Sequence, residues 1–170
     1  MLYRLNSVIY NLITLKTIYW KTLTDIFTKK KRSEIMSRIS GKETKPEILV
    51  RKLLFANGFR YRKNDKRYPG KPDIVLPKYK TVIFINGCFW HGHKNCKKAN
   101  LPKTNYEFWK NKIDENIQRD KKIYEQLKVQ GWNVLILWQC QLNNQNNIKR
   151  TIDKLIKNLK NQRTANKGYT

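Results

Sequence analysis

The sequence has few acidic residues for its length. Only 12 Asp and Glu side chains stand against 37 Lys and Arg in 170 residues, which gives a formal net charge of +25 at pH 7. Such an excess of positive charge repels itself unless a polyanion lies nearby, so nucleic acid is the favoured partner. A compositional bias toward lysine would explain part of the excess without any partner.

Cysteines and long apolar runs are also scarce. The chain has 3 cysteines, an odd number that argues against a disulfide framework and favours a reduced, cytoplasmic protein. No run reaches the roughly 18 apolar residues that a membrane span needs. The apolar run at 8–15 contains Asn11 and lacks a small-residue cleavage site, which argues against a signal peptide. We therefore expect no association with a membrane.

Capping signals and apolar residues at helical spacing predict three helices. The first begins at the capping box 44–47 and ends at 57–58, where the sequence is Asn-Gly. The second begins at a capping box at 104–107 and runs to about Gln130, and the third contains residues 152–159. Residues 161–170 are interpreted as a disordered basic tail.

Apolar runs bounded by turn residues predict the strands. They lie at 59–61, 73–76, 81–85 and 132–138. The order along the chain is helix, strands, long helix, strand, helix. This order predicts an α/β fold in which a small mixed sheet is flanked by helices.

Three cysteines and one histidine have the spacing of metal ligands. Cys88, His93 and Cys96 form the pattern C-x4-H-x2-C, and Cys140 follows the strongest predicted strand. If that strand lies parallel to the strand before Cys88, all four side chains can converge on a structural Zn2+ in a closed Cys3His site. The alternative is three unrelated buried thiols, which are common in small cores.

Carboxylates are so few that their positions are informative. Asp73 opens a strand beside the cysteine loop, where it would suit Mg2+, although a turn-capping role is an equal alternative. Asp120 lies on or near the apolar face of the long helix, so it needs a partner, either a histidine or a Lys or Arg side chain. Glu47 either completes its capping box or reaches a metal-bound water.

Large aromatic side chains flank the same loop. Phe89 and Trp90 lie within it, and Trp109 opens the long helix. Proteins that kink or open duplex DNA insert such side chains between base pairs. Ordinary core packing is the alternative.

Six segments occur in order: KRSEIMSRI, TKPEILVRKLL, YPGKPDIVL, VIFINGCFWHGH, KTNYEFWKNKIDENIQRD and GWNVLILWQC. Together they resemble the very short patch repair (Vsr) endonucleases, DNA mismatch nicking enzymes with a restriction-endonuclease-like fold. The resemblance covers about residues 24–141. We therefore assign residues 24–160 to one endonuclease domain. Residues 1–23 could form an additional helix, but we favour an extension outside the native fold.

The resemblance implies roles for five residues around a catalytic Mg2+. Asp73 matches the essential metal ligand, and the backbone carbonyl of Ile85 matches a second ligand. His91 matches the histidine that acts on the attacking water, and Asp120 matches the carboxylate that supports it. Glu47 matches an acidic residue near the metal waters.

The resemblance also implies residues for zinc binding and for intercalation. Cys88, His93, Cys96 and Cys140 match the structural Zn2+ ligands. Phe89, Trp90 and Trp109 match aromatics that intercalate beside the mismatch from the major groove, and Met36 matches a residue that inserts from the minor groove.

Two positions depart from the family pattern. Asn86 stands where the family's best-known member has a second active-site histidine, and Asn cannot relay a proton at neutral pH. The segment 91–96 is one residue longer than in that pattern.

The resemblance implies a monomeric bacterial enzyme that uses Mg2+ to nick duplex DNA 5′ to the thymine of a T:G mismatch. Such mismatches arise when 5-methylcytosine deaminates, so a functional link to a DNA cytosine-5 methyltransferase follows, with MutL as a candidate partner. Two other functions stay open: a sequence-specific restriction-type endonuclease on the same fold, and a non-catalytic, zinc-stabilised DNA-binding domain.

Overall fold

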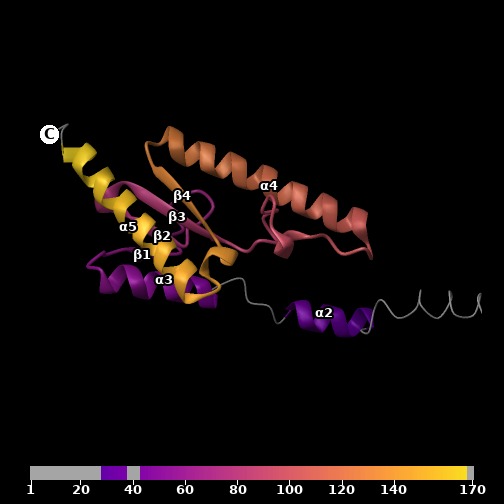
Figure 1. Cartoon of the computed structure of the whole chain (residues 1–170). Coiled ribbons are helices and arrows are strands. Elements are labelled where there is room, and N and C mark those ends of the chain that lie inside the picture. Colours follow the sequence, from indigo (N-terminus) through magenta and orange to yellow (C-terminus); the bar gives the residue numbers. More distant parts are fainter. Residues whose placement is uncertain (1–27, 38–42, 168–170) are drawn as a thin grey trace, which may run out of the picture. The chain divides into compact units, whose positions relative to one another are not determined.

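The computed structural model of the protein describes residues 28–37 and 43–167. The chain divides into two compact units, residues 1–42 and 43–170. Helix α2 (Lys29–Ser37) belongs to the first unit, and the other labelled elements belong to the second (Figure 1). The predicted extension, residues 1–23, and the predicted start of the domain at residue 24 lie outside the described residues and stay predictions.

The second unit contains a four-stranded mixed sheet in the order β1-β2-β3-β4. Its strands are β1 (Arg62–Lys63), β2 (Ile74–Leu76), β3 (Thr81–Asn86) and β4 (Asn133–Trp138). β2 pairs antiparallel with both β1 and β3, whereas β3 and β4 pair in parallel. The predicted α/β class and mixed sheet are confirmed, and β2, β3 and β4 lie within one residue of their predicted bounds.

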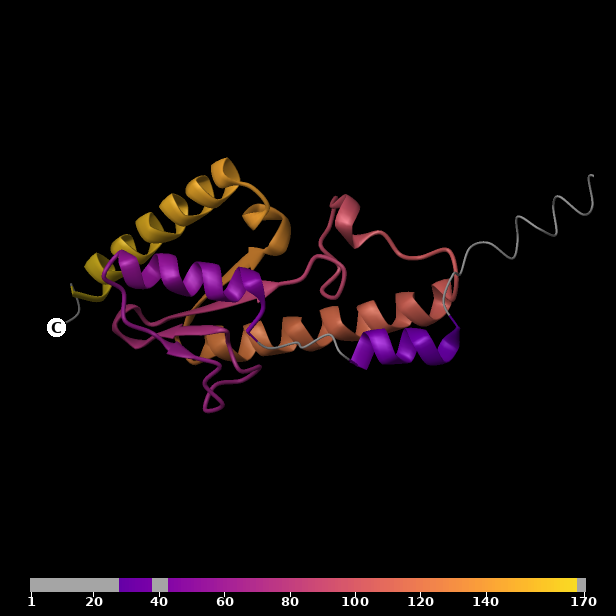
Figure 2. The same ribbon diagram turned by 90° about the horizontal axis from the view of Figure 1, so that it is seen from below.

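Helices cover both faces of the sheet (Figures 1 and 2). The long helix α4 lies on one face, and α3 and α5 lie on the other. The helices are α3 (Lys45–Ala56), α4 (Tyr106–Val129) and α5 (Gln145–Lys167), with short 3-10 helices η1 (Pro77–Tyr79), η2 (Lys97–Ala99) and η3 (Gln139–Leu142). No helix in the described parts of the chain is long and apolar enough to cross a membrane.

Two hydrophobic cores follow from this layering, because successive residues of a strand point to opposite faces. The larger core joins Ile74 and Ile83 to α3 and α5, and the smaller joins Val75 and Val82 to Leu127 of α4. All three residues of β2 are fully buried, as expected for a strand covered on both faces. This double cover holds the ends of β2, β3 and β4 in fixed places.

The strand predicted at 59–61 is wrong, because the backbone there completes the end of α3. The N–H of Phe59 donates to the carbonyl of Leu54 at 3.0 Å, and the N–H of Gly58, at a φ of +81°, donates to Phe55 at 3.0 Å. This pair of bonds is a Schellman motif. Pairing with β2 begins only at Arg62.

Two other helix boundaries differ from their predictions. The capping box at 104–107 does not form, since Asn105 takes a left-handed φ of +53° and caps α4 without a side-chain bond. The predicted disordered tail is helical as far as Lys167. Residues 161–167 contain no Gly or Pro, and each added helical residue gains one backbone hydrogen bond, so α5 propagates toward Gly168.

Candidate active site and the adjoining cysteine cluster

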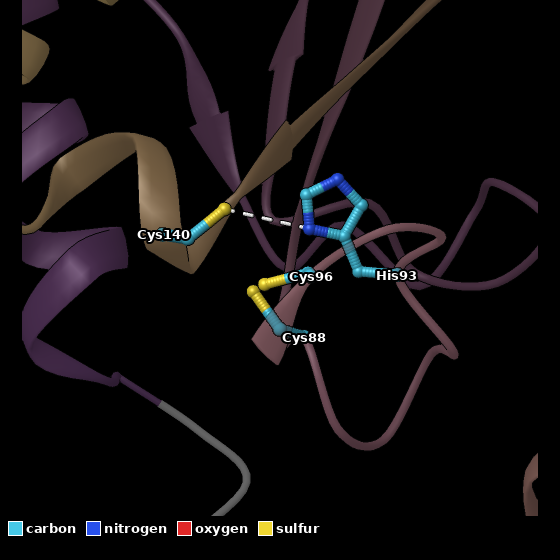
Figure 3. A group of neighbouring side chains, drawn as sticks. All are labelled: Cys88, His93, Cys96 and Cys140. Atoms are coloured by element: carbon cyan, nitrogen blue, oxygen red, sulfur yellow. Dashed lines mark hydrogen bonds between the residues drawn. The ribbon is translucent and has the colours of Figure 1, made fainter. Parts of the chain in front are cut away.

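The parallel pairing of β3 and β4 brings two cysteines together. Asn86 and Trp138 are register partners at the ends of the two strands, so Cys88 and Cys140 each follow by two residues at one edge of the sheet. The loop after β3 adds His93 and Cys96. The ligand atoms of all four lie within 4.8 Å of one another (Figure 3). The predicted convergence of these side chains is therefore confirmed.

The donor set of this cysteine cluster (Cys88, His93, Cys96, Cys140) fits a zinc ion. Zinc–sulfur bonds of about 2.3 Å place tetrahedral ligands about 3.8 Å apart, and Cys140 Sγ lies 3.4 Å from His93 Nδ1. Burial, followed by the neighbouring thiols of Cys88 and Cys96, raises the pKa of Cys140 to about 11. The backbone N–H of Lys98 lowers the pKa of Cys96. Crowded thiols of this kind become compatible thiolates when a cation lies between them.

The loop between Asn86 and Cys96 is docked onto α4. The side-chain amide of Asn116 donates to the carbonyl of Trp90 at 3.0 Å. Gly92 has a φ of +57°, and a Cβ there would lie 2.5 Å from Ile117 Cδ1. Glycine therefore suits this turn, because the positive φ and the nearby isoleucines both disfavour a side chain there. Its two histidines diverge, because His93 enters the cysteine cluster and His91 faces α4.

His91 and Asp120 form a direct pair. His91 Nδ1 bonds to Oδ2 of Asp120, while Arg119 donates to Oδ1 at 3.0 Å. Burial opposes ionisation of Asp120, but the bonds from His91 and Arg119 outweigh it, so the pKa of this carboxyl is lowered. Both of the partners that the sequence allowed are therefore present. The second ring nitrogen of His91 makes no hydrogen bond within the described part of the chain.

Asp73 lies where β2 begins and faces β3. Its Oδ2 accepts the backbone N–H of Ile85 at 2.7 Å. Burial raises the pKa of Asp73 to about 6, and the charge of Glu47 adds to this shift. Such a carboxylate is stabilised by a cation, and its other oxygen has no partner among the described residues. One free carboxylate oxygen suits Mg2+, which takes few protein ligands and keeps water.

The contact between Asp73 and Ile85 uses the N–H of Ile85, so the carbonyl of Ile85 as a metal ligand stays a prediction.

Glu47 is held by its own helix, which confirms its predicted contact with the N-cap. Oε1 accepts the N–H of Thr44 at 3.3 Å and its hydroxyl at 2.8 Å. Oε2 pairs with Nη2 of Arg51 at 2.7 Å, and both side chains are at most 7% exposed. The sequence reading missed Arg51. Its place four residues after Glu47 and beside Val50 was the available signal.

Asn86 also has a partner that the sequence reading missed. Its Nδ2 donates to the hydroxyl of Tyr124 at 3.0 Å. The spacing of Tyr124, one turn after Asp120 on α4, was the available signal.

The predicted intercalating aromatics form one cluster outside both cores. Ring centroids of Phe89, Trp90 and Trp109 lie 5.2–5.9 Å apart in edge-to-face contacts. Phe108, which the sequence reading missed, lies 5.2 Å from Trp109 and is 62% exposed. The side chain of Met36, the remaining predicted intercalator, lies outside the described residues.

Comparisons with known proteins agree on one family. The family model described as DNA mismatch endonuclease Vsr matches residues 24–98. The type II nicking enzyme V.NmeAIP of Neisseria meningitidis serogroup A is 54% identical over 138 residues, which cover 81% of this chain and 98% of that protein. The type II nicking enzyme V.XorIIP of Xanthomonas oryzae pv. oryzae is 42% identical over 120 residues, which cover 71% of this chain and 88% of that protein.

The DNA mismatch endonuclease Vsr of Escherichia coli strain K12 is 40% identical over 120 residues, which cover 71% of this chain and 76% of that protein. The matched segment 24–98 contains Asp73, His91 and three members of the cysteine cluster, Cys88, His93 and Cys96. The chain belongs to the family of Vsr DNA mismatch endonucleases.

Proposed function

We propose that this Vsr-family endonuclease uses Mg2+ to nick duplex DNA 5′ to the thymine of a T:G mismatch. The enzyme class and the DNA substrate follow from the family. The observation that carries the finer proposal is the gathering of Asp73, His91 and Asp120 beside the end of β3. A metal-ligating carboxylate and an oriented histidine are the groups that phosphodiester hydrolysis needs.

The residues divide the work of hydrolysis between them. Asp73 and the carbonyl of Ile85 would hold Mg2+, and Glu47 would contact its waters. The bound ion would offset negative charge that grows on the phosphate oxygens. His91 would take a proton from the attacking water while the water oxygen bonds to phosphorus. The bond from phosphorus to the leaving oxygen would break, and that oxygen would take a proton from solvent water. Asp120 would hold the imidazole by Nδ1 and stabilise its cation.

The cysteine cluster has a separate role in this proposal. Cys88, His93, Cys96 and Cys140 would bind a structural Zn2+, because a closed set of four ligands leaves no position for a reactive water. The ion would fix the loop that carries His91, Phe89 and Trp90. Residues for hydrolysis, for base stacking and for zinc binding would therefore alternate along one loop.

Recognition of the mismatch would rest on deformability. A wobble pair unstacks at lower cost than a Watson–Crick pair, so an aromatic wedge of Phe89, Trp90 and Trp109 would enter beside it more readily. Met36 would insert from the minor groove. The net charge of +25 would supply phosphate affinity that falls steeply with salt. Deamination of 5-methylcytosine would link the enzyme to a cytosine-5 methyltransferase, with MutL as a candidate partner.

A nicking assay on end-labelled duplexes tests the proposal. Duplexes with one T:G, T:A or C:G pair in the same flanking sequence are incubated with the full chain in Mg2+ or in chelator. We expect one nick, only in the T strand of the T:G duplex and only with Mg2+. Asp73→Ala should abolish nicking while DNA binding persists, and persistent nicking would remove Asp73 from the mechanism.

The other outcomes identify the alternatives. Cleavage of both strands in matched DNA would identify a restriction-type endonuclease. Binding without any cleavage would identify a non-catalytic domain. Relatives named as nicking enzymes support the cleavage of one strand.

A further inference from the structure

The Asn86–Tyr124 pair lies among the residues proposed for hydrolysis. The ring of Tyr124 packs in the smaller core, 5.0 Å from the ring of Phe84. Its hydroxyl reaches the end of β3, where Nδ2 of Asn86 donates to it at 3.0 Å. Asn86 is only 4% exposed, so this bond fixes the phenol in a protected place. The ring is therefore anchored while its polar end meets the site.

Asn86 and Tyr124 each lie close in the sequence to a residue proposed for hydrolysis. Asn86 follows Ile85, whose N–H binds Asp73. Tyr124 lies one helical turn after Asp120, so the two side chains share one face of α4. Burial raises the pKa of Tyr124 to about 12, and the charges of Asp120 and Asp73 contribute to the shift. The hydroxyl therefore keeps its proton at neutral pH.

The hydrogen bonds of the phenol leave its proton available. A tyrosine hydroxyl has one hydrogen to donate, and its oxygen accepts. Here the oxygen accepts from Asn86, while its hydrogen finds no acceptor among the described residues. A free phenol proton at the end of β3, where Asp73 and His91 would act, is suited to an oxygen atom of the substrate phosphate.

We propose that Tyr124 is a further catalytic residue, whose hydroxyl donates a hydrogen bond to a non-bridging oxygen of the scissile phosphate. Asn86 is its positioning residue. The inference rests on the proposed function and deepens it, because it assigns a donor at the place where the family's second histidine is missing. No proton is transferred and no covalent bond forms, so the phenol stabilises charge on the phosphate as it reacts.

Tyr124→Phe removes only the hydroxyl and tests the proposal directly. We expect kcat for T:G nicking to fall about 10- to 100-fold with little change in KM, because the bond strengthens as charge develops. Asn86→Ala should cost less, since the phenol keeps its proton and loses only its anchor. Tyr68→Phe is the matched control, because Tyr68 packs on the same core, 4.8 Å from the ring of Trp132, and should keep full activity.

Sulfur substitution separates a phosphate contact from a structural role. Sulfur accepts hydrogen bonds poorly, so the wild type should be slowed on the phosphorothioate isomer that replaces the contacted oxygen. In Tyr124→Phe that slowing should shrink for one isomer and stay unchanged for the other. If sulfur slows the wild type and Tyr124→Phe by the same factor on each isomer, the proposal is overturned. This holds even if Tyr124→Phe is slow for structural reasons.

The role of Tyr124 and the proposed function are overturned by different results. If the wild type nicks T:G duplexes and Tyr124→Phe nicks at the same rate, only the role of Tyr124 is overturned. If the wild type does not nick T:G duplexes at all, the proposed function is overturned, and the role of Tyr124 with it.

Discussion

The loop between Asn86 and Cys96 supplies residues to two different sites: the cysteine cluster, and the candidate active site of Asp73, His91 and Asp120. In the cluster, three thiols and one imidazole lie within 4.8 Å of one another, which is a complete set of ligands for a tetrahedral ion. Around Asp73 and His91, each side chain is fixed through one atom and keeps another unpartnered within the described part of the chain. This difference matches the two proposed roles. A closed set of ligands immobilises a loop, whereas polar side chains with an unpartnered atom can act on a substrate.

The largest effect that separates the two sites is expected from His91→Ala. This substitution removes the proposed general base and leaves the four residues of the cysteine cluster in place. We expect kcat for T:G nicking to fall about 10²- to 10⁴-fold, the usual contribution of a general base. Steady-state nicking measures the loss, and zinc content should not change, whereas stability should fall slightly because Asp120 loses its bond to His91. A loss of zinc would show that the two sites are not independent.

Cys140→Ser disrupts the cysteine cluster instead. One ligand of four is lost, and we expect zinc content to fall from about one ion per chain and stability to fall by about 2–5 kcal/mol. Metal analysis and urea unfolding measure the two effects. Cys140 lies after β4 rather than in the loop, so the loop sequence itself is unchanged. A folded wild-type protein without zinc would contradict the structural metal site.

The aromatic cluster offers a smaller effect that sharpens the comparison. Trp90 lies in the loop between the two sites, and its truncation to Ala should weaken binding of T:G duplex relative to matched duplex about tenfold, within the stacking energy of about 1–3 kcal/mol per base. Phe108→Ala is the matched variant, since Phe108 is 62% exposed and lies outside the loop. Competition binding measures both, and equal losses would show that the loop contributes no more to recognition of the mismatch than the exposed aromatic of α4.

The sequence predicted much of this arrangement because its signals are local. Buried runs and turn residues placed β2, β3 and β4 within one residue, and the parallel pairing of β3 with β4 then brought Cys88 and Cys140 together. What it missed depends on tertiary contacts. The burial of Arg51 and the bond between Asn86 and Tyr124 join elements by packing, for which spacing alone carries only a weak signal. Likewise, the composition of residues 59–61 favoured a strand, but the N–H of Phe59 bonds to Leu54 at the end of α3 instead.

The smallest effect concerns the pH dependence of the candidate active site. The pKa of Asp120 is lowered in the folded protein, so its carboxylate stabilises the fold above the ordinary carboxyl pKa of about 3.9, and this contribution is lost as pH falls through the folded-state pKa. Asp120→Asn should therefore cost about 1 kcal/mol at pH 7 and progressively less toward pH 3. Urea unfolding of both proteins across this range measures the difference. Because protonation of the cysteine cluster affects both proteins equally, a difference that stays constant with pH would assign the role of Asp120 to packing rather than to charge.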